Sequence, residues 1–353
     1  MQSTKNDTMT VRKSLWLGIL FTFSLLDACK EAPKQEKSEG NDIAAAFSIT
    51  ILDDEALAII DPKAKIEILA SGFKWTEGPL WVPSGNYLLF SDIPNNKVFK
   101  WDAKRDTTTY LEPSGFTGSN FTGEEPGSNG LLLNPDGELV LMQHGDRRVA
   151  KMNATLENPL ANFTTMVDRF EGKRLNSPND GIFDKAGNLY FTDPPYGLPK
   201  GMDDPNKELD FQGVYCYLAS GELVLVDRLS RPNGIALSPE QNILYVAVSD
   251  PQHAVWYAYD LISPGQVENK RLLYEVTEWV GKPDQPGLPD GMKVNDKGYL
   301  FATGPGGIWI FDANGKALAR IHTGQATANC AFTPDQKTLF MTADDYLLSV
   351  DLK

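Results

Sequence analysis

The chain contains few of the residues that common hydrolase and metal sites use. It has three cysteines and three histidines among 353 residues. It has no G-x-S-x-G elbow and no histidine pair at zinc-binding spacing, so neither a serine hydrolase nor a zinc protease is supported. Basic residues are outnumbered, since 33 Lys and Arg stand against 47 Asp and Glu for a formal net charge of −14. This balance argues against a nucleic-acid partner, whose phosphates require a basic patch, and is compatible with a cation site.

Long apolar runs are also missing, apart from one near the N-terminus. Arg12 and Lys13 precede a mostly apolar stretch over residues 15–26, which is too short to span a bilayer and is typical of an export signal. The following Leu26-Asp27-Ala28-Cys29 is similar to a lipobox, in which Cys29 becomes the lipidated first residue; an ordinary signal peptide with a chance cysteine is the alternative. We expect a signal peptide over residues 1–28 and a protein anchored at the bacterial cell envelope, in the periplasm or at the outer membrane.

The rest of the chain divides into a short linker and one large domain. Residues 29–50 are charged and contain proline without an apolar period, which predicts a flexible tether. Residues 51–353 are predicted to form a single all-β domain, since such folds often exceed the usual domain length. Within it, Cys216 and Cys330 fall in strands of different repeats, so we expect both to be buried and unpaired.

A phrase recurs six times in this domain. It has a polar residue and usually a glycine, an apolar run, a turn rich in Pro, Asp and Gly, and a second apolar run. The glycines of its first five copies stand at positions 78, 130, 181, 234 and 291, and the sixth copy begins at Asn329. A period near 50 residues with several short strands in each copy indicates a β-propeller.

The last copy lacks a fourth strand, and residues 66–69 have the pattern to supply it. We therefore predict a six-bladed β-propeller closed by an N-terminal strand that pairs with the last blade, which removes an exposed edge. Residues 53–60 favour a short helix. The connections 112–128, 193–213 and 281–289 are long and lie on the same face as the phrase heads, where function is expected to gather.

Four of the phrase heads carry side-chain oxygens that should converge at the mouth of the central channel. They are Glu77, Asn179, Asn233 and Asp290. Two carboxylates and two amides suit Ca²⁺, with water as further ligands, and would also accept Mg²⁺, Mn²⁺ or Zn²⁺. The alternative is that Asn-Gly and Asp-Gly only form turns at the strand starts. That alternative does not explain Glu77, which is a poor turn residue at the same repeat position.

Several strings in the domain are long and specific: EGPLW (77–81), FSDIPNN (90–96), HGDRR (144–148), KRLNSPND (173–180), FTDPPYG (191–197) and RPNG (231–234). Together they resemble the bacterial gluconolactonase branch of the senescence-marker-protein/gluconolactonase (regucalcin-like) family. The resemblance covers about residue 50 to the C-terminus. It implies a six-bladed propeller, hydrolysis of sugar lactones, and one divalent cation on Glu77, Asn179, Asn233 and Asp290. Some relatives have an Arg where this chain has Ser177, and Arg174 is the residue that could replace it as a substrate contact.

The proton acceptor is left open between two residues. Asp290 would act as both cation ligand and base, whereas His144 ends a second strand on the same face, and imidazole commonly serves as a base near neutral pH. Asn129, Asp193 and Tyr196 fall on this face and are expected to bind sugar hydroxyls, with packing as the alternative for Tyr196.

Two other functions are compatible with the same pattern. One is a hydrolase of this fold that acts on another ester or on an organophosphate; a polar cavity would favour a polyol, and an aromatic one an apolar ester. The other is a propeller without catalytic activity that binds a surface glycan or protein from its lipid anchor. The phrase heads would then be replaceable without loss of function.

Overall fold

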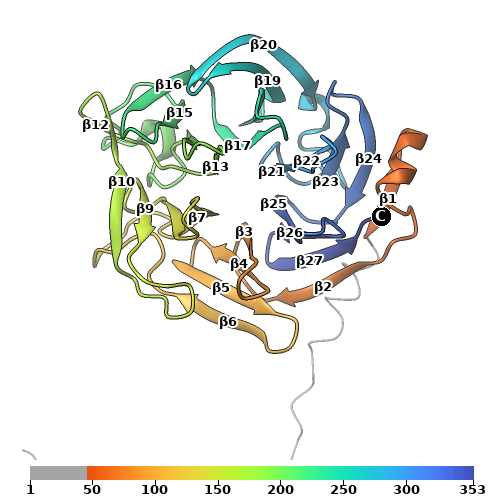
Figure 1. The fold of residues 1–353 in the computed structure, drawn as a ribbon, viewed down its shortest axis with the longest axis horizontal. Coiled ribbons are helices and arrows are strands. Elements are labelled where there is room, and N and C mark those ends of the chain that lie inside the picture. Colours follow the sequence, from red (N-terminus) through yellow and green to blue (C-terminus); the bar gives the residue numbers. More distant parts are fainter. Residues whose placement is uncertain (1–45) are drawn as a thin grey trace, which may run out of the picture. The chain divides into compact units, whose positions relative to one another are not determined.

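The computed structural model describes residues 46–353, which form a ring of six antiparallel β-sheets around a central channel (Figure 1). The first three blades contain β3 (Thr76–Val82), β4 (Tyr87–Asp92), β5 (Lys97–Asp102) and β6 (Asp106–Leu111); β7 (Ser128–Leu133), β8 (Leu139–Gln143), β9 (Arg148–Met152) and β10 (Phe163–Val167); and β13 (Gly181–Phe183), β14 (Leu189–Asp193), β15 (Gly213–Tyr217) and β16 (Leu223–Arg228).

The remaining blades complete the ring, and the first strand of each repeat lies nearest the channel (Figure 1). Blade four contains β17 (Pro232–Leu237), β18 (Ile243–Asp250), β19 (His253–Ser263) and β20 (Gln266–Glu275). Blade five contains β21 (Met292–Val294), β22 (Leu300–Gly304), β23 (Gly307–Phe311) and β24 (Ala317–His322). Blade six contains β25 (Thr327–Phe332), β26 (Thr338–Ala343) and β27 (Tyr346–Asp351). The small hairpin of β11 (Arg169–Phe170) and β12 (Lys173–Arg174) precedes blade three. Thus the predicted six-bladed all-β propeller is confirmed.

The ring is closed as the sequence predicts. Strand β2 (Ile66–Ser71) pairs antiparallel with β27, from Ile66 opposite Val350 to Ser71 opposite Tyr346. It supplies the fourth strand of blade six, so the hydrogen-bonding edge of β27 is covered by a segment from the other end of the domain. Blades one to four are each built from consecutive strands.

The N-terminal part of the domain begins earlier than expected. Strand β1 (Ser48–Ile51) pairs with β24 and adds a fifth strand to blade five, so the assignment of residues 48–50 to the tether was wrong. Ile49 and Ile51 face the core, and this alternation is too short to stand out in the sequence. The helix expected over residues 53–60 is a short 3-10 helix, η1 (Asp54–Ala58), capped by the Asp53 carboxylate. Two further 3-10 turns are η2 (Gly201–Asp203) and η3 (Thr277–Trp279).

The predicted signal peptide, the lipidation at Cys29 and most of the tether lie outside the described residues. Within residues 46–353, the structure contains no helix that is both long enough and apolar enough to cross a membrane.

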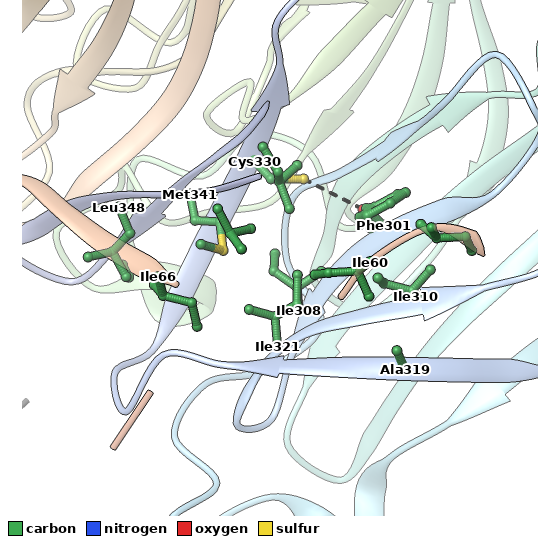
Figure 2. Close-up of a cluster of buried hydrophobic side chains, with 14 of the residues drawn as sticks. Ile60, Ile66, Phe301, Ile308, Ile310, Ala319, Ile321, Cys330, Met341 and Leu348 are labelled. Carbon is green, nitrogen blue, oxygen red and sulfur yellow. Dashed lines mark hydrogen bonds between the residues drawn. The ribbon is translucent and has the colours of Figure 1, made fainter. Parts of the chain in front are cut away.

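A large hydrophobic cluster lies between blades five and six (Figure 2). It joins residues from η1, β2 and both blades, including Ile60, Ile66, Ile308, Ile310, Ile321, Met341 and Leu348. Cys330 packs here, and its thiol lies 3.6 Å from the Phe301 carbonyl oxygen. Both described cysteines, Cys216 and Cys330, are buried and free, as predicted.

Hydroxyl groups link neighbouring blades near the channel. The hydroxyl of Thr192, on the second strand of blade three, donates to the backbone carbonyl of Asn233 at the head of blade four (2.6 Å). Ser91 does the same from blade one to the Asn129 carbonyl of blade two (2.8 Å). Because each bond ties the second strand of one blade to the phrase head of the next, these bonds fix where the head side chains meet.

Candidate functional site at the mouth of the channel

The phrase heads meet as the repeat predicts. The four expected ligands, Glu77, Asn179, Asn233 and Asp290, together with Asn129, line one cavity of about 330 Å³. Each lies at the first strand of its blade or in the residues just before it. The sequence reasoning therefore identified five residues that the fold brings together from five different blades.

Backbone irregularities turn the head side chains toward the channel. The strand ladders shift register between Glu77 and Leu80 in β3 and between Pro232 and Ile235 in β17. Such bulges redirect a side chain out of the regular alternation. Next to Glu77, Gly78 has a φ of +54°, and a Cβ on it would lie 2.2 Å from the backbone oxygen of Asn129. Glycine at this position is needed for the first two blades to meet.

Four side-chain oxygens at the cavity have no partner. The Oδ1 atoms of Asn129, Asn179, Asn233 and Asp290 are buried and make no hydrogen bond within residues 46–353. A buried polar group left unsatisfied costs about 1–3 kcal/mol, so four in one cavity indicate a missing partner. The Nδ2 of Asn233 donates to the Ser249 hydroxyl (3.1 Å), which leaves its Oδ1 facing away from that bond.

These oxygens fit a hard divalent cation. Carboxylate and amide oxygens are the protein ligands that Ca²⁺ and similar ions prefer. Neither sulfur nor imidazole belongs to the set, and the described part of the chain contains no cluster of three or more Cys, His, Asp and Glu suited to a metal. The arrangement depends on asparagine, which supplies oxygen without adding charge.

The site concentrates negative charge in a buried place. Burial, followed by the carboxylate of Asp180, raises the pKa of Glu77 to about 7. Burial also raises the pKa of Asp290 well above its ordinary value, and the charge of Glu77 raises it further. The positive charge of Lys293 lowers the pKa of Glu77, and so does the hydrogen bond that Asn329 donates to Glu77 Oε2 (3.1 Å). A bound cation would stabilise the charged forms of both carboxylates.

Three predicted site residues lie outside the cavity. His144 is fully buried behind Glu125, with its Nδ1 2.9 Å from Glu125 Oε2. Asp193 accepts a hydrogen bond from the Asn176 backbone (2.8 Å), and burial raises its pKa to about 7. Arg174 lines a separate cleft. His144, Asp193 and Arg174 are therefore not among the residues that line this cavity.

Arg174 and Tyr196 show how the loops decide these positions. Arg174 donates to the Asp146 carbonyl (2.9 Å), which turns it away from the channel. By contrast, Tyr196 lines the cavity, and burial raises the pKa of its hydroxyl. Ser177, which stands where some relatives have Arg, donates to the Pro194 carbonyl (2.6 Å) and accepts from the Gly197 amide (2.9 Å). These two bonds hold the turn that carries Tyr196.

The sequence reasoning missed part of the cavity lining. Glu125, from the connection between β6 and β7, and Ser249, at the end of β18, add polar groups. Trp75, Ile93 and Leu288 form an apolar part of the lining. The cavity thus joins polar groups suited to hydroxyls with an aromatic wall, so its polarity alone does not separate a polyol from an apolar ester. Trp75 lies two residues before Glu77, the head of the first phrase, which is the only sequence signal that could have located it.

Comparison with known proteins agrees with this geometry. Residues 75–345 match the family model described as SMP-30/Gluconolactonase/LRE-like region. The gluconolactonase of Zymomonas mobilis is 40% identical over 301 residues, which cover 84% of this chain and 83% of that protein. A solved gluconolactonase structure from Xanthomonas campestris aligns with a TM-score of 0.74 at 29% identity, covering 87% of this chain and 95% of that one. A structure from Agrobacterium tumefaciens described as a calcium-binding protein, regucalcin, has a TM-score of 0.63 at 17% identity, covering 81% and 94%, and shows the shared fold.

Proposed function

Because the chain belongs to the SMP-30/gluconolactonase/LRE-like family, we propose that it is a lactonase that hydrolyses a sugar lactone of the gluconolactone type. The observation that supports this most is the set of four unpartnered oxygens, of Asn129, Asn179, Asn233 and Asp290, in one cavity. They give the cavity both a place for a cation and an acceptor for a substrate hydroxyl. A propeller that only binds a partner would have no need to leave buried oxygens without partners.

We propose further that Glu77, Asn179, Asn233 and Asp290 hold one divalent cation, and that this cation is Ca²⁺. The four ligand oxygens carry two negative charges, and Ca²⁺ accepts six to eight oxygen ligands, so water and substrate can complete the shell. A cation bound there would polarise the lactone carbonyl and offset the negative charge that develops on its oxygen. The neighbouring Asp180 adds a third carboxylate close to Glu77, which strengthens the attraction for a cation.

The remaining lining supplies binding and orientation. Asn129 Oδ1 is free to accept a hydrogen bond from a sugar hydroxyl, and the Tyr196 hydroxyl lies on the same cavity. Trp75 and Leu288 offer an apolar wall for the C–H face of a sugar ring. The carboxylates of Glu77, Asp290 and Glu125 all line the cavity and can take a proton from water, and of these three only Glu125 lies outside the proposed ligand set.

The site lies in a domain that we propose is exported and held at the cell envelope by a lipid on Cys29. The support is the run of apolar residues over 15–26 and the lipobox-like Leu26-Asp27-Ala28-Cys29. A sugar lactone is a small polar molecule, so an enzyme placed there would meet it outside the cytoplasm.

A lactone panel with a chelator tests the proposal. Acid release from five- and six-membered sugar lactones would be followed at constant pH, before and after EDTA and after Ca²⁺ is returned. We expect turnover of sugar lactones that EDTA abolishes and Ca²⁺ restores. An apolar lactone and an organophosphate ester are included as competing substrates. Faster turnover of either would contradict the sugar specificity, and full activity in EDTA would contradict the cation.

Asn233→Ala and Asn153→Ala provide a matched pair for that panel. The first removes an unpartnered cavity oxygen, and the second removes an exposed side chain on the turn between β9 and β10. Only Asn233→Ala should lose activity and raise the Ca²⁺ concentration needed for half-maximal rate. Equal behaviour of the two variants would argue against Asn233 as a ligand.

A further inference from the structure

The loop that carries Glu125 is fixed against the end of strand β8. The backbone amide of His144 donates to the Gly127 carbonyl (3.1 Å). On the other side, the Pro126 carbonyl lies so near Gly145 that a Cβ there would approach it to 2.6 Å. Because the chain is held directly after Glu125, its side chain enters the cavity from a fixed position.

Glu125 and His144 form a pair of which only one member reaches the cavity. His144 Nδ1 lies 2.9 Å from Glu125 Oε2; the side chain of His144 is 0% exposed and that of Glu125 is 32% exposed. Glu125 lines the cavity with the proposed cation ligands, whereas His144 does not. The histidine therefore lies behind the glutamate, on the side away from the channel.

The hydrogen bonds assign a role to each atom of the pair. His144 Nε2 is buried without a partner among the described residues. Because an ionised carboxylate oxygen can only accept a hydrogen bond, we assign a proton to His144 Nδ1, which donates it to Glu125 Oε2. Glu125 Oε1 makes no hydrogen bond to any residue within 46–353, so it is free for a molecule in the cavity. The histidine thus fixes the carboxylate by one oxygen and leaves the other available.

The position of Glu125 is also close to the proposed reaction centre. Its charge contributes to the raised pKa of Asp290, after burial and the nearer carboxylates of Glu77 and Asp180. It also contributes to the raised pKa of the Tyr196 hydroxyl, where burial is the main cause. Glu125 therefore lies within electrostatic reach of both a proposed ligand and a proposed substrate contact, although it belongs to neither group.

We propose that Glu125 is a catalytic residue that carries the proton during lactone opening, and that His144 is its positioning residue. This inference rests on the proposed lactone hydrolysis. The Glu125 carboxylate takes a proton from a water molecule as the water oxygen bonds to the carbonyl carbon. When the bond between that carbon and the ring oxygen breaks, the ring oxygen takes the proton from Glu125. One water is consumed, the product is the hydroxy acid, and Glu125 is again a carboxylate.

The test for Glu125 compares two neighbouring glutamates. Glu125→Gln keeps the size and the acceptor for His144 but cannot take the proton, so kcat should fall by about 10²- to 10⁴-fold with little change in KM. Glu124→Gln makes the same change at an exposed position of the same loop and should keep the wild-type rate. Ca²⁺ affinity and melting temperature are measured for both to show that the site and the fold are intact.

Two substitutions of His144 separate positioning from packing. Asparagine places an amide N–H near the Nδ1 position and can still donate to Glu125, whereas glutamine places its amide near the Nε2 position and cannot. If His144 positions Glu125, kcat should be higher in His144→Asn than in His144→Gln, although glutamine fills the buried space better. A role in packing alone predicts the reverse order.

The outcomes distinguish this inference from the function on which it rests. If the wild-type protein hydrolyses no lactone in the panel, the proposed function fails and the inference fails with it. If the wild type is active and Glu125→Gln keeps its kcat, the inference alone is overturned. Equal or reversed kcat values for His144→Asn and His144→Gln would overturn the role of His144.

Discussion

Thr192→Val tests whether the hydroxyl links between blades support the site. Thr192 is fully buried, donates to the Asn233 carbonyl (2.6 Å) and accepts from the Asp180 amide (3.3 Å). Valine has nearly the same shape, so packing is kept while both backbone groups lose this partner. Leaving a buried polar group unsatisfied costs about 1–3 kcal/mol. Because Asn233 is a proposed ligand, the variant should also bind Ca²⁺ more weakly.

The expected loss translates into a measurable shift in the melting temperature. A domain of roughly 300 residues has an unfolding entropy of about 0.6 kcal/mol/K, so 1 kcal/mol corresponds to about 1.5 °C. Thr192→Val should therefore melt about 2–5 °C below the wild type in calorimetry. Added Ca²⁺ should raise the melting temperature of the variant by less than it raises that of the wild type. The control is Thr108→Val, on the exposed strand β6, which should melt like the wild type. Identical melting of Thr192→Val and Thr108→Val would refute the reasoning.

Three further predictions concern the cation, the pH dependence and the location of the protein. Asp290→Ala should abolish turnover and also remove the stabilisation by Ca²⁺, which is about 2.7 kcal/mol in the wild type at 100 times the dissociation constant; a Ca²⁺-dependent melting shift in the variant would contradict the ligand assignment. Burial raises the pKa of Asp193 to about 7, so the stability that this group contributes is complete below its unfolded pKa of about 3.9 and is lost as the pH rises through 7. As the pH rises between those values, Asp193→Asn should thus lose less stability than the wild type. Free energies of unfolding from urea titrations that fall equally with pH in both proteins would contradict this prediction. Cys29→Ala should move the protein out of the membrane fraction or leave it unprocessed while activity is kept, and a wild-type protein already soluble in the periplasm with another mature N-terminus would reject the anchor.

The architecture was predictable because it repeats. Glycines at positions 78, 130, 181, 234 and 291 mark the first strand in five of the repeats. A repeat of this length can still be recognised when one strand within it is assigned wrongly. Ring closure by β2 followed from the missing fourth strand of the last repeat. Strand β1 was missed because it has four residues, two of them half-buried, and its partner β24 lies about 270 residues later in the chain.

The proposed cation ligands could be picked out for a similar reason, since Glu77, Asn233 and Asp290 directly precede the glycine of their repeats and Asn179 lies two residues before Gly181. The rest of the site depends on loop conformation, which no repeat determines. Glu124 and Glu125 are identical neighbours in the sequence, yet the second one lines the cavity, in a loop that a backbone hydrogen bond from His144 to Gly127 holds in place. His144 was correctly placed at the end of its strand, but the loop over that end shields it from the channel.

Arg174 shows the same limit of sequence reasoning. The family resemblance offered it as the residue that could replace the Arg of some relatives at position 177, yet in the structure its guanidinium donates to the Asp146 carbonyl. Spacing along the chain fixes which face of a propeller a residue occupies, whereas the hydrogen bonds of the loops fix whether it reaches the channel.

The most direct test of the account is a Ca²⁺ titration of the chelated wild-type protein during hydrolysis of a sugar lactone, with the spontaneous rate subtracted. The unpartnered oxygens of Asn179, Asn233 and Asp290 predict a rate that rises from background and reaches its plateau at one Ca²⁺ per chain. A chelated protein that hydrolyses the lactone as fast as the Ca²⁺-saturated protein would contradict the account.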